Sequence, residues 1–237
     1  MARTAAAVAL LLLSSAALGQ GRAEPRGDGN LVTQARAVSD FDAVRLEGPL
    51  HALVKVGGPA SASVTIDGNL QPEVLVRVED RTLVVSVRHD LSSRRVARVE
   101  IGAPRLAALS LHGSGDAQVE GASGGDVKLS VQGSGGVRWA GVAAGALEVE
   151  IEGSGATDLE GTAEELRLSL DGSGTVQARG LVARNVRVRV RGSGEVDLSL
   201  GGGSLDAEVD GSGAVRWSGE ARIGRAEVLG SGRITRR

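Results

Sequence analysis

The sequence has 237 residues, a formal net charge of −2, no cysteine, no tyrosine and only three aromatic residues among Phe, Trp and Tyr. This charge balance argues against nucleic acid as a partner, and the lack of cysteine excludes disulfides and a lipid anchor on a thiol. Beyond the first residues no apolar run reaches the ~20 residues that a membrane helix needs, so we expect no transmembrane segment in the mature chain.

The first 23 residues are predicted to be a secretory signal peptide. Arg3 supplies the positive start, residues 5–13 form an apolar run too short to span a bilayer, and small residues then allow cleavage after Gly19 or Ala23. We therefore expect an exported protein of the periplasm, the outer surface or the medium.

Residues 24–37 are polar and lack periodicity, which predicts a flexible lead-in. The segment contains Arg26-Gly27-Asp28, the tripeptide that host integrins recognise. Chance occurrence in a linker rich in glycine and arginine is one interpretation, and integrin binding is the other. The sequence leaves both open.

Residues 38–105 are predicted to form an irregular β region. Turn signals such as Gly57-Gly58-Pro59 and Asp67-Gly68-Asn69 separate short runs that are typical of strands. The runs are Val44–Leu46, Ala52–Val56, Val64–Ile66, Val74–Val78 and Leu83–Val87. No segment after the signal has helical periodicity over about 11 or more residues, so we expect an all-β protein.

Residues 106–235 carry seven copies of Gly-Ser-Gly, which begin at Gly113, Gly133, Gly153, Gly172, Gly192, Gly211 and Gly230. The spacing of successive copies is nearly constant. A fixed period of about 20 residues is typical of a solenoid, in which each turn buries its apolar side against the next turn. We expect residues 38–235 to form one elongated β-solenoid domain.

Each repeat combines a longer strand, the triplet and a shorter strand. Alternate positions are apolar before the triplet, as in Leu147, Val149 and Ile151, and after it, as in Val137 and Trp139. This alternation predicts strands with one buried face, and the glycines predict tight corners between them. Equivalent residues should stack in columns, one of which is predicted to contain Val131, Ile151, Leu170, Val190 and Val209.

The outward positions of two neighbouring strands carry opposite charges. Arg187, Arg189 and Arg191 alternate along one strand, and the next strand is acidic at the equivalent positions. The acidic residues are Asp206, Glu208 and Asp210. Our main interpretation is that these charges favour one stacking order. The alternative is that the arginine stripe is a surface site that binds a polyanion.

No catalytic, cofactor or metal site is predicted. Residues 121–125 match the G-x-S-x-G string of serine hydrolases around Ser123, but no helix follows to form the required elbow. The triplet serines are too repetitive to be nucleophiles and should form a column of hydroxyls at a corner. Acidic residues follow the triplets only at Asp116 and Glu195, which argues against a calcium-binding repeat. The histidines lack ligand spacing; they are His51, His89 and His112.

Several motifs resemble the head GIN domain family of bacterial exported proteins, often labelled auto-transporter adhesins. They are the start Phe41-Asp42-Ala43-Val44, the turn Asp67-Gly68-Asn69-Leu70, the repeated Gly-Ser-Gly turns, and the ending from Gly211 to Gly219 and Gly230 to Ile234. The resemblance covers about residues 38–235. It implies a right-handed β-helix-like fold at the cell envelope, and it brings no catalytic residue onto this sequence.

We interpret the chain as a non-enzymatic, adhesin-like interaction module of the cell envelope or the medium, without a cofactor and with an envelope, cell-surface or glycan partner. The alternative is a carbohydrate-active β-helix protein that binds or cleaves a polysaccharide. Such proteins use clustered charges with aromatic platforms. Trp139 and Trp217 have the parity of buried valines, so we expect inward packing rather than sugar stacking.

Overall fold

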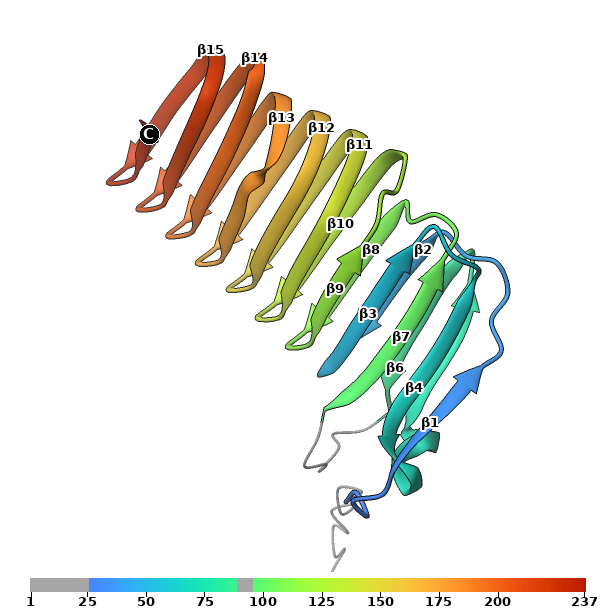
Figure 1. Cartoon of the computed structure of the whole chain (residues 1–237). Helices are drawn as coiled ribbons and strands as arrows, with labels where there is room; N and C mark the ends of the chain where they lie inside the picture. The colour runs from blue at the N-terminus through green and yellow to red at the C-terminus, as the bar shows by residue number, and fades with distance from the viewer. Residues whose placement is uncertain (1–25, 89–95) are drawn as a thin grey trace, which may run out of the picture.

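The computed structural model describes residues 26–88 and 96–237. In this part of the chain the strands join in one 16-stranded sheet that winds around a common interior (Figure 1). The helical content there is the short 3-10 helix η1 (Gly68–Glu73), and no helix has the length and apolar character to cross a membrane. The expected all-β solenoid is confirmed, whereas the predicted signal peptide lies outside the described residues.

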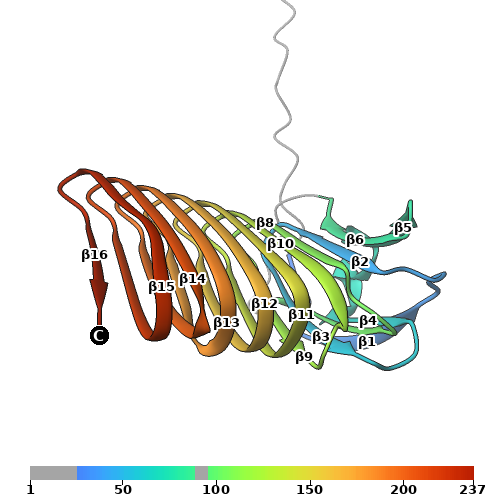
Figure 2. The ribbon, with the colours of Figure 1, turned by 90° about the horizontal axis from the view of Figure 1, so that it is seen from above.

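The repeats form a regular stack of parallel coils. Each strand is parallel to the next through β10 (Gly125–Gly133), β11 (Gly136–Gly153), β12 (Ala156–Gly172), β13 (Thr175–Gly192), β14 (Glu195–Gly211), β15 (Ala214–Gly230) and β16 (Arg233–Arg236). Triplet lies on triplet, because Gly133 pairs with Gly153 and Gly153 with Gly172. Figure 2 shows the coils following one another around the same interior.

Each coil has two broad faces and a short third side. The first face consists of the residues after each triplet, such as 136–140, and the second face of the residues before the next triplet, such as 147–153. Between them a short segment also pairs with the neighbouring coil, for example Ala143 with Thr162 and Ala146 with Glu165. The sequence predicted only two strands in each repeat. The third side was missed because its segment is too short to show a clear alternation of apolar and polar residues.

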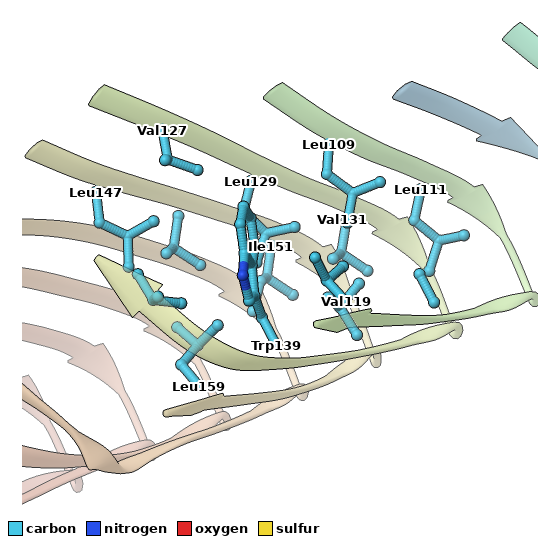
Figure 3. Packing of buried hydrophobic residues seen from close by; sticks show 14 of the residues in the cluster. Leu109, Leu111, Val119, Val127, Leu129, Val131, Trp139, Leu147, Ile151 and Leu159 are labelled. Carbon is cyan, nitrogen blue, oxygen red and sulfur yellow. The ribbon is translucent and has the colours of Figure 1, made fainter. Parts of the chain in front are cut away.

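Aliphatic side chains fill the interior. The predicted column of Val131, Ile151, Leu170, Val190 and Val209 is confirmed, since each of these residues is at most 1% exposed. Trp139 is fully buried and lies in register with Leu159 of the next coil; Figure 3 shows both in the interior. Each coil buries these residues only against its neighbours, so the stability of the stack is approximately a sum of nearest-neighbour contributions.

The two glycines of a triplet are needed for different reasons. Gly172, the first of its triplet, has a φ of 125°, and a Cβ there would collide with the carbonyl oxygen of Gly153. Gly174, the last, lacks a positive φ, but a Cβ there would lie 2.7 Å from the carbonyl oxygen of Gly155. Glycine therefore permits both the turn and the close approach of successive corners.

The N-terminal strands extend both faces with segments from distant parts of the chain. The first face continues through β9 (Asp116–Glu120), β3 (Leu50–Val56), β7 (Ala97–Ala103), β4 (Ser61–Asp67) and β1 (Leu31–Arg36). The second face continues through β8 (Ala108–Gly113), β2 (Ala43–Glu47), β6 (Thr82–Val87) and β5 (Val74–Glu79). The five predicted strand runs are confirmed as parts of β2 to β6. The pairs β1–β4, β4–β7 and β5–β6 are antiparallel, so the parallel order ends here.

The predicted lead-in is wrong for residues 31–36, which form β1 and pair with β4. Gln71 of η1 also holds this strand: its Nε2 donates to the carbonyl oxygen of Val32 at 2.6 Å, and its Oε1 accepts from Arg36 at 2.7 Å. The strand is exposed on nearly all positions, so it has no apolar alternation to identify it. Its partner β4, which is not adjacent to it in the sequence, decides its conformation.

Candidate functional site

A trough of 860 Å³ crosses the first face where the N-terminal strands meet the repeats. It is lined from β3, β7, β9, β11, β12 and β13. It is hollow because three successive coils have a small residue at the same outward position, namely Gly136, Ala156 and Thr175. The trough is therefore a consequence of side-chain size along one column.

The rim of the trough is polar and charged. Asp116 Oδ1 accepts a hydrogen bond from the backbone N–H of Gly136 at 3.0 Å, and its Oδ2 lies 3.3 Å from Nδ1 of His51. Arg138 forms an ion pair with Asp158 of the next coil at 3.0 Å. These contacts orient the carboxylates, while the exposed side chains keep further donors and acceptors facing solvent. Such an arrangement suits a polar ligand that hydrogen-bonds to both kinds of group.

The three small residues belong to a column of equivalent positions that can be found in the sequence once the register of the coils is known. It is the position after each triplet, considered above for calcium, and it reads Asp116, Gly136, Ala156, Thr175, Glu195, Ala214 and Arg233. Among residues 26–88 and 96–237, which do not include His89, no group of three histidine or carboxylate side chains is placed to hold a metal ion. The column marks a hollow rather than a row of ligands.

A second hollow, of 560 Å³, lies on the second face around Ser169. Its walls have opposite charges: Glu148 and Glu150 on one side, Arg187 and Arg189 on the other. Lys128 lies 2.9 Å from Glu150, and this hydrogen bond raises the pKa of the Lys128 ammonium. Both signs are therefore present within one depression.

The predicted stacking of the charged strands is confirmed. Arg187, Arg189 and Arg191 lie opposite Asp206, Glu208 and Asp210. The closest approaches are 3.7 Å for Arg187 with Asp206 and 3.0 Å for Arg189 with Glu208. The hydrogen bond from Arg189 lowers the pKa of the Glu208 carboxyl. These guanidinium groups thus bind adjacent coils together at the surface.

Neither Ser123 nor the tryptophans are open to a ligand. Ser123 is buried and its hydroxyl donates to the carbonyl oxygen of Leu106, so it is not a nucleophile at a strand-to-helix elbow. Trp139 is buried, and its Nε1 donates to the carbonyl oxygen of Gly121 at 3.1 Å. Trp217 is 7% exposed, and the guanidinium of Arg236 lies 5.0 Å from the centre of its ring. The prediction that both indoles pack inward is confirmed.

The triplet serines form the predicted column along one corner of the solenoid, and they are exposed. The tripeptide Arg26-Gly27-Asp28 lies against the start of η1. Asn69 accepts from the backbone N–H of Asp28 at 3.1 Å and donates to the carbonyl oxygen of Arg26 at 2.7 Å. Both ends of the tripeptide are thus held by one asparagine, although the sequence predicted a flexible segment.

Residues 40–221 match the family described as "Putative auto-transporter adhesin, head GIN domain". The chain belongs to this family. Among solved structures, the head GIN fold seen here is similar to a "putative adhesin" from Bacteroides fragilis, with 24% identity, a TM-score of 0.83, and coverage of 90% of this chain and 99% of that one. It is also similar to a "Putative lipid binding protein" from Parabacteroides distasonis, with 22% identity, a TM-score of 0.72 and coverage of 90% and 99%. A comparison with curated proteins finds no match.

Proposed function

We propose that the chain is a non-enzymatic, adhesin-like interaction module that is exported to the cell envelope or the medium. The partner binds over the side of the solenoid, and the trough on the first face is its main contact. The main support for the proposal is the column of Gly136, Ala156 and Thr175. Because these side chains are small, they leave a hollow on the strand surface. Family membership supports a role in adhesion.

The trough favours a polar partner such as a glycan of the envelope or of another cell. Its charged side chains are paired in rows across adjacent strands, so a ligand with many hydroxyls can donate to carboxylates and accept from guanidinium groups without a net charge of its own. The exposed Arg187, Arg189 and Arg191 provide a secondary contact for anionic groups in this proposal.

A glycan array with the wild-type chain and two matched variants tests the trough. Ala156→Phe fills the hollow, whereas Thr162→Phe places the same ring on the third side of the same strand; both positions are exposed. We expect Ala156→Phe to lose binding at least tenfold and Thr162→Phe to retain it, with equal Tm values. Equal binding by both variants would remove the trough from the proposal.

The second candidate function is that of a carbohydrate-active protein that cleaves a polysaccharide. The specific observation in its favour is the pair of exposed carboxylates Glu148 and Glu150 beside the second hollow. A reducing-sugar assay on the polysaccharides bound in the array separates the two functions. Cleavage that disappears in Glu148→Gln or Glu150→Gln would replace the binding module by an enzyme.

A further inference from the structure

The last full coil leaves part of the apolar interior uncovered. Ile223, Ala226 and Val228 of β15 lie in register with Leu205, Ala207 and Val209 of β14. The three residues of β14 are at most 2% exposed because β15 covers them, whereas Ile223 is 44% and Val228 38% exposed. One further layer of protein would bury these residues.

The outer edge of this coil is also unpaired over most of its length. The final strand β16, at the C-terminal end in Figure 2, pairs only with residues 214–217 of β15. Within the described part of the chain no strand pairs with the outer edge of residues 218–230. An open β edge next to exposed apolar residues is a template for another strand.

We propose that a second copy of this chain covers this end, through a two-fold axis at Ala226 that pairs the two β15 edges antiparallel. The charges along the β15 edge are complementary in this arrangement. Arg225 and Glu227 both point outward, since they are in register with the outward Asp206 and Glu208. Within one copy Arg225 donates to Glu227 of the same strand, its Nε at 2.8 Å from Oε2. With Ala226 on the axis, Arg225 of each copy also lies opposite Glu227 of the second copy, so the four charges alternate in sign around the axis.

Other registers lack this complementarity. A shift of the axis by one residue to Arg225 or Glu227 places like charges opposite each other. If the two-fold axis lies midway between two residues of β15, each outward residue of one copy is opposite an inward residue of the other copy. The apolar inward residues of the two copies then face opposite sides of the joined sheet. The regular part of the edge begins at Arg225, because the register with β14 shifts between Ile223 and Arg225. The proposed axis therefore lies within the regular segment.

The two-fold contact is closed, so it gives a dimer and no larger assembly. The opposite end of the molecule has different edge strands, β1 and β5. A contact between that end and β15 would be head to tail, and it would produce open filaments. Mass in solution therefore distinguishes the two arrangements.

Sedimentation equilibrium of the purified chain is the test. We expect a monomer–dimer equilibrium for wild type. Arg225→Glu places two glutamates opposite Glu227, and Glu227→Arg places two arginines opposite Arg225, so each single variant should dimerise at least about tenfold more weakly. A mixture of the two single variants should form a heterodimer, because every charge of one then faces its opposite in the other. The double variant Arg225→Glu/Glu227→Arg should dimerise again.

Arg222→Glu is the matched control, because it reverses an exposed charge on the same coil that lies outside the regular segment around the proposed axis. We expect it to dimerise like wild type, and all variants to melt within a few degrees of one another. A wild type that stays monomeric at high concentration, filaments in place of dimers, or single variants that dimerise as well as wild type would each overturn the proposal.

Discussion

The repeats and the N-terminal strands build one solenoid by different means. In the repeats each strand pairs with the equivalent strand of the next repeat, and one triplet lies on another. In the N-terminal part β3 pairs with β7 and β9, and antiparallel strands at both faces end the parallel order. The same core thus depends on close repetition at one end and on specific long-range pairs at the other.

The corners of the repeats therefore tolerate few side chains in place of glycine, whereas the corner after β3 has space for one. A Cβ on Gly133, Gly153 or Gly172 would collide with the corner of the preceding coil, because every triplet is covered by the same backbone. At Gly57 and Gly58, in the turn after β3, a Cβ would meet nothing within 4 Å. Stacking, rather than turn geometry alone, makes the repeat sequence strict.

The largest expected effect comes from a charge in the repeat core. Leu168 is 3% exposed, whereas the next residue, Ser169, points outward. Leu168→Asp buries an unpaired carboxylate and should cost roughly 3–5 kcal/mol of unfolding free energy. Ser169→Asp is the control and should stay close to wild type. Denaturant unfolding measures both, and equal losses would mean that the faces are assigned in reverse.

Alanine at two glycines with positive φ compares the two kinds of corner directly. Gly172 has a φ of 125° and the stacked corner beside it, whereas Gly57 has a φ of 99° and open space. Both substitutions cost about 1–2 kcal/mol of backbone strain, and only Gly172→Ala adds the collision with Gly153. We expect Gly172→Ala to lower Tm clearly more than Gly57→Ala. Similar Tm values would show that stacking does not restrict the triplet.

Reversal of the arginine stripe should have a moderate effect that depends on salt. Replacing Arg187, Arg189 and Arg191 by glutamate sets like charges opposite each other on β13 and β14. We expect a drop in Tm of about 5 °C at low salt and partial recovery at high salt, because screening weakens the repulsion. Reversing the three acidic partners as well should restore most of the loss. If only ligand binding changes, the stripe is a binding site.

The smallest effect concerns an ion pair of the N-terminal part. Arg81 donates to Asp42 at 2.9 Å, and this hydrogen bond holds the pKa of the Asp42 carboxyl below its ordinary value. The carboxylate therefore stabilises the fold above the pKa of the unfolded chain, and the contribution is lost as pH falls through the lower folded pKa. Asp42→Asn should lower Tm by about 2 °C at pH 7. Thermal melts below about pH 3 should show the difference from wild type shrinking; an equal difference at both pH values would argue against the ion pair.

The buried face of the repeats could be predicted because alternation decides it locally. Leu166, Leu168 and Leu170 face inward in the structure as their spacing indicates. The order of β3, β7 and β9 could not be predicted, since their pairing depends on contacts between segments without a common motif. The trough needed the register as well, because Gly136 and Ala156 become neighbours only when the coils are stacked. The exposed edge of β15 likewise depends on the short reach of β16, which pairs only with residues 214–217.

The stacked triplets make the length of the molecule adjustable in discrete steps. One repeat adds one strand to each face, which lengthens the solenoid by ~4.8 Å. Each coil contacts only its two neighbours. Duplicating or deleting one internal repeat should therefore leave the structures of the N-terminal strands and of the last coil unchanged. The number of repeats thus determines the distance between the two ends of the protein.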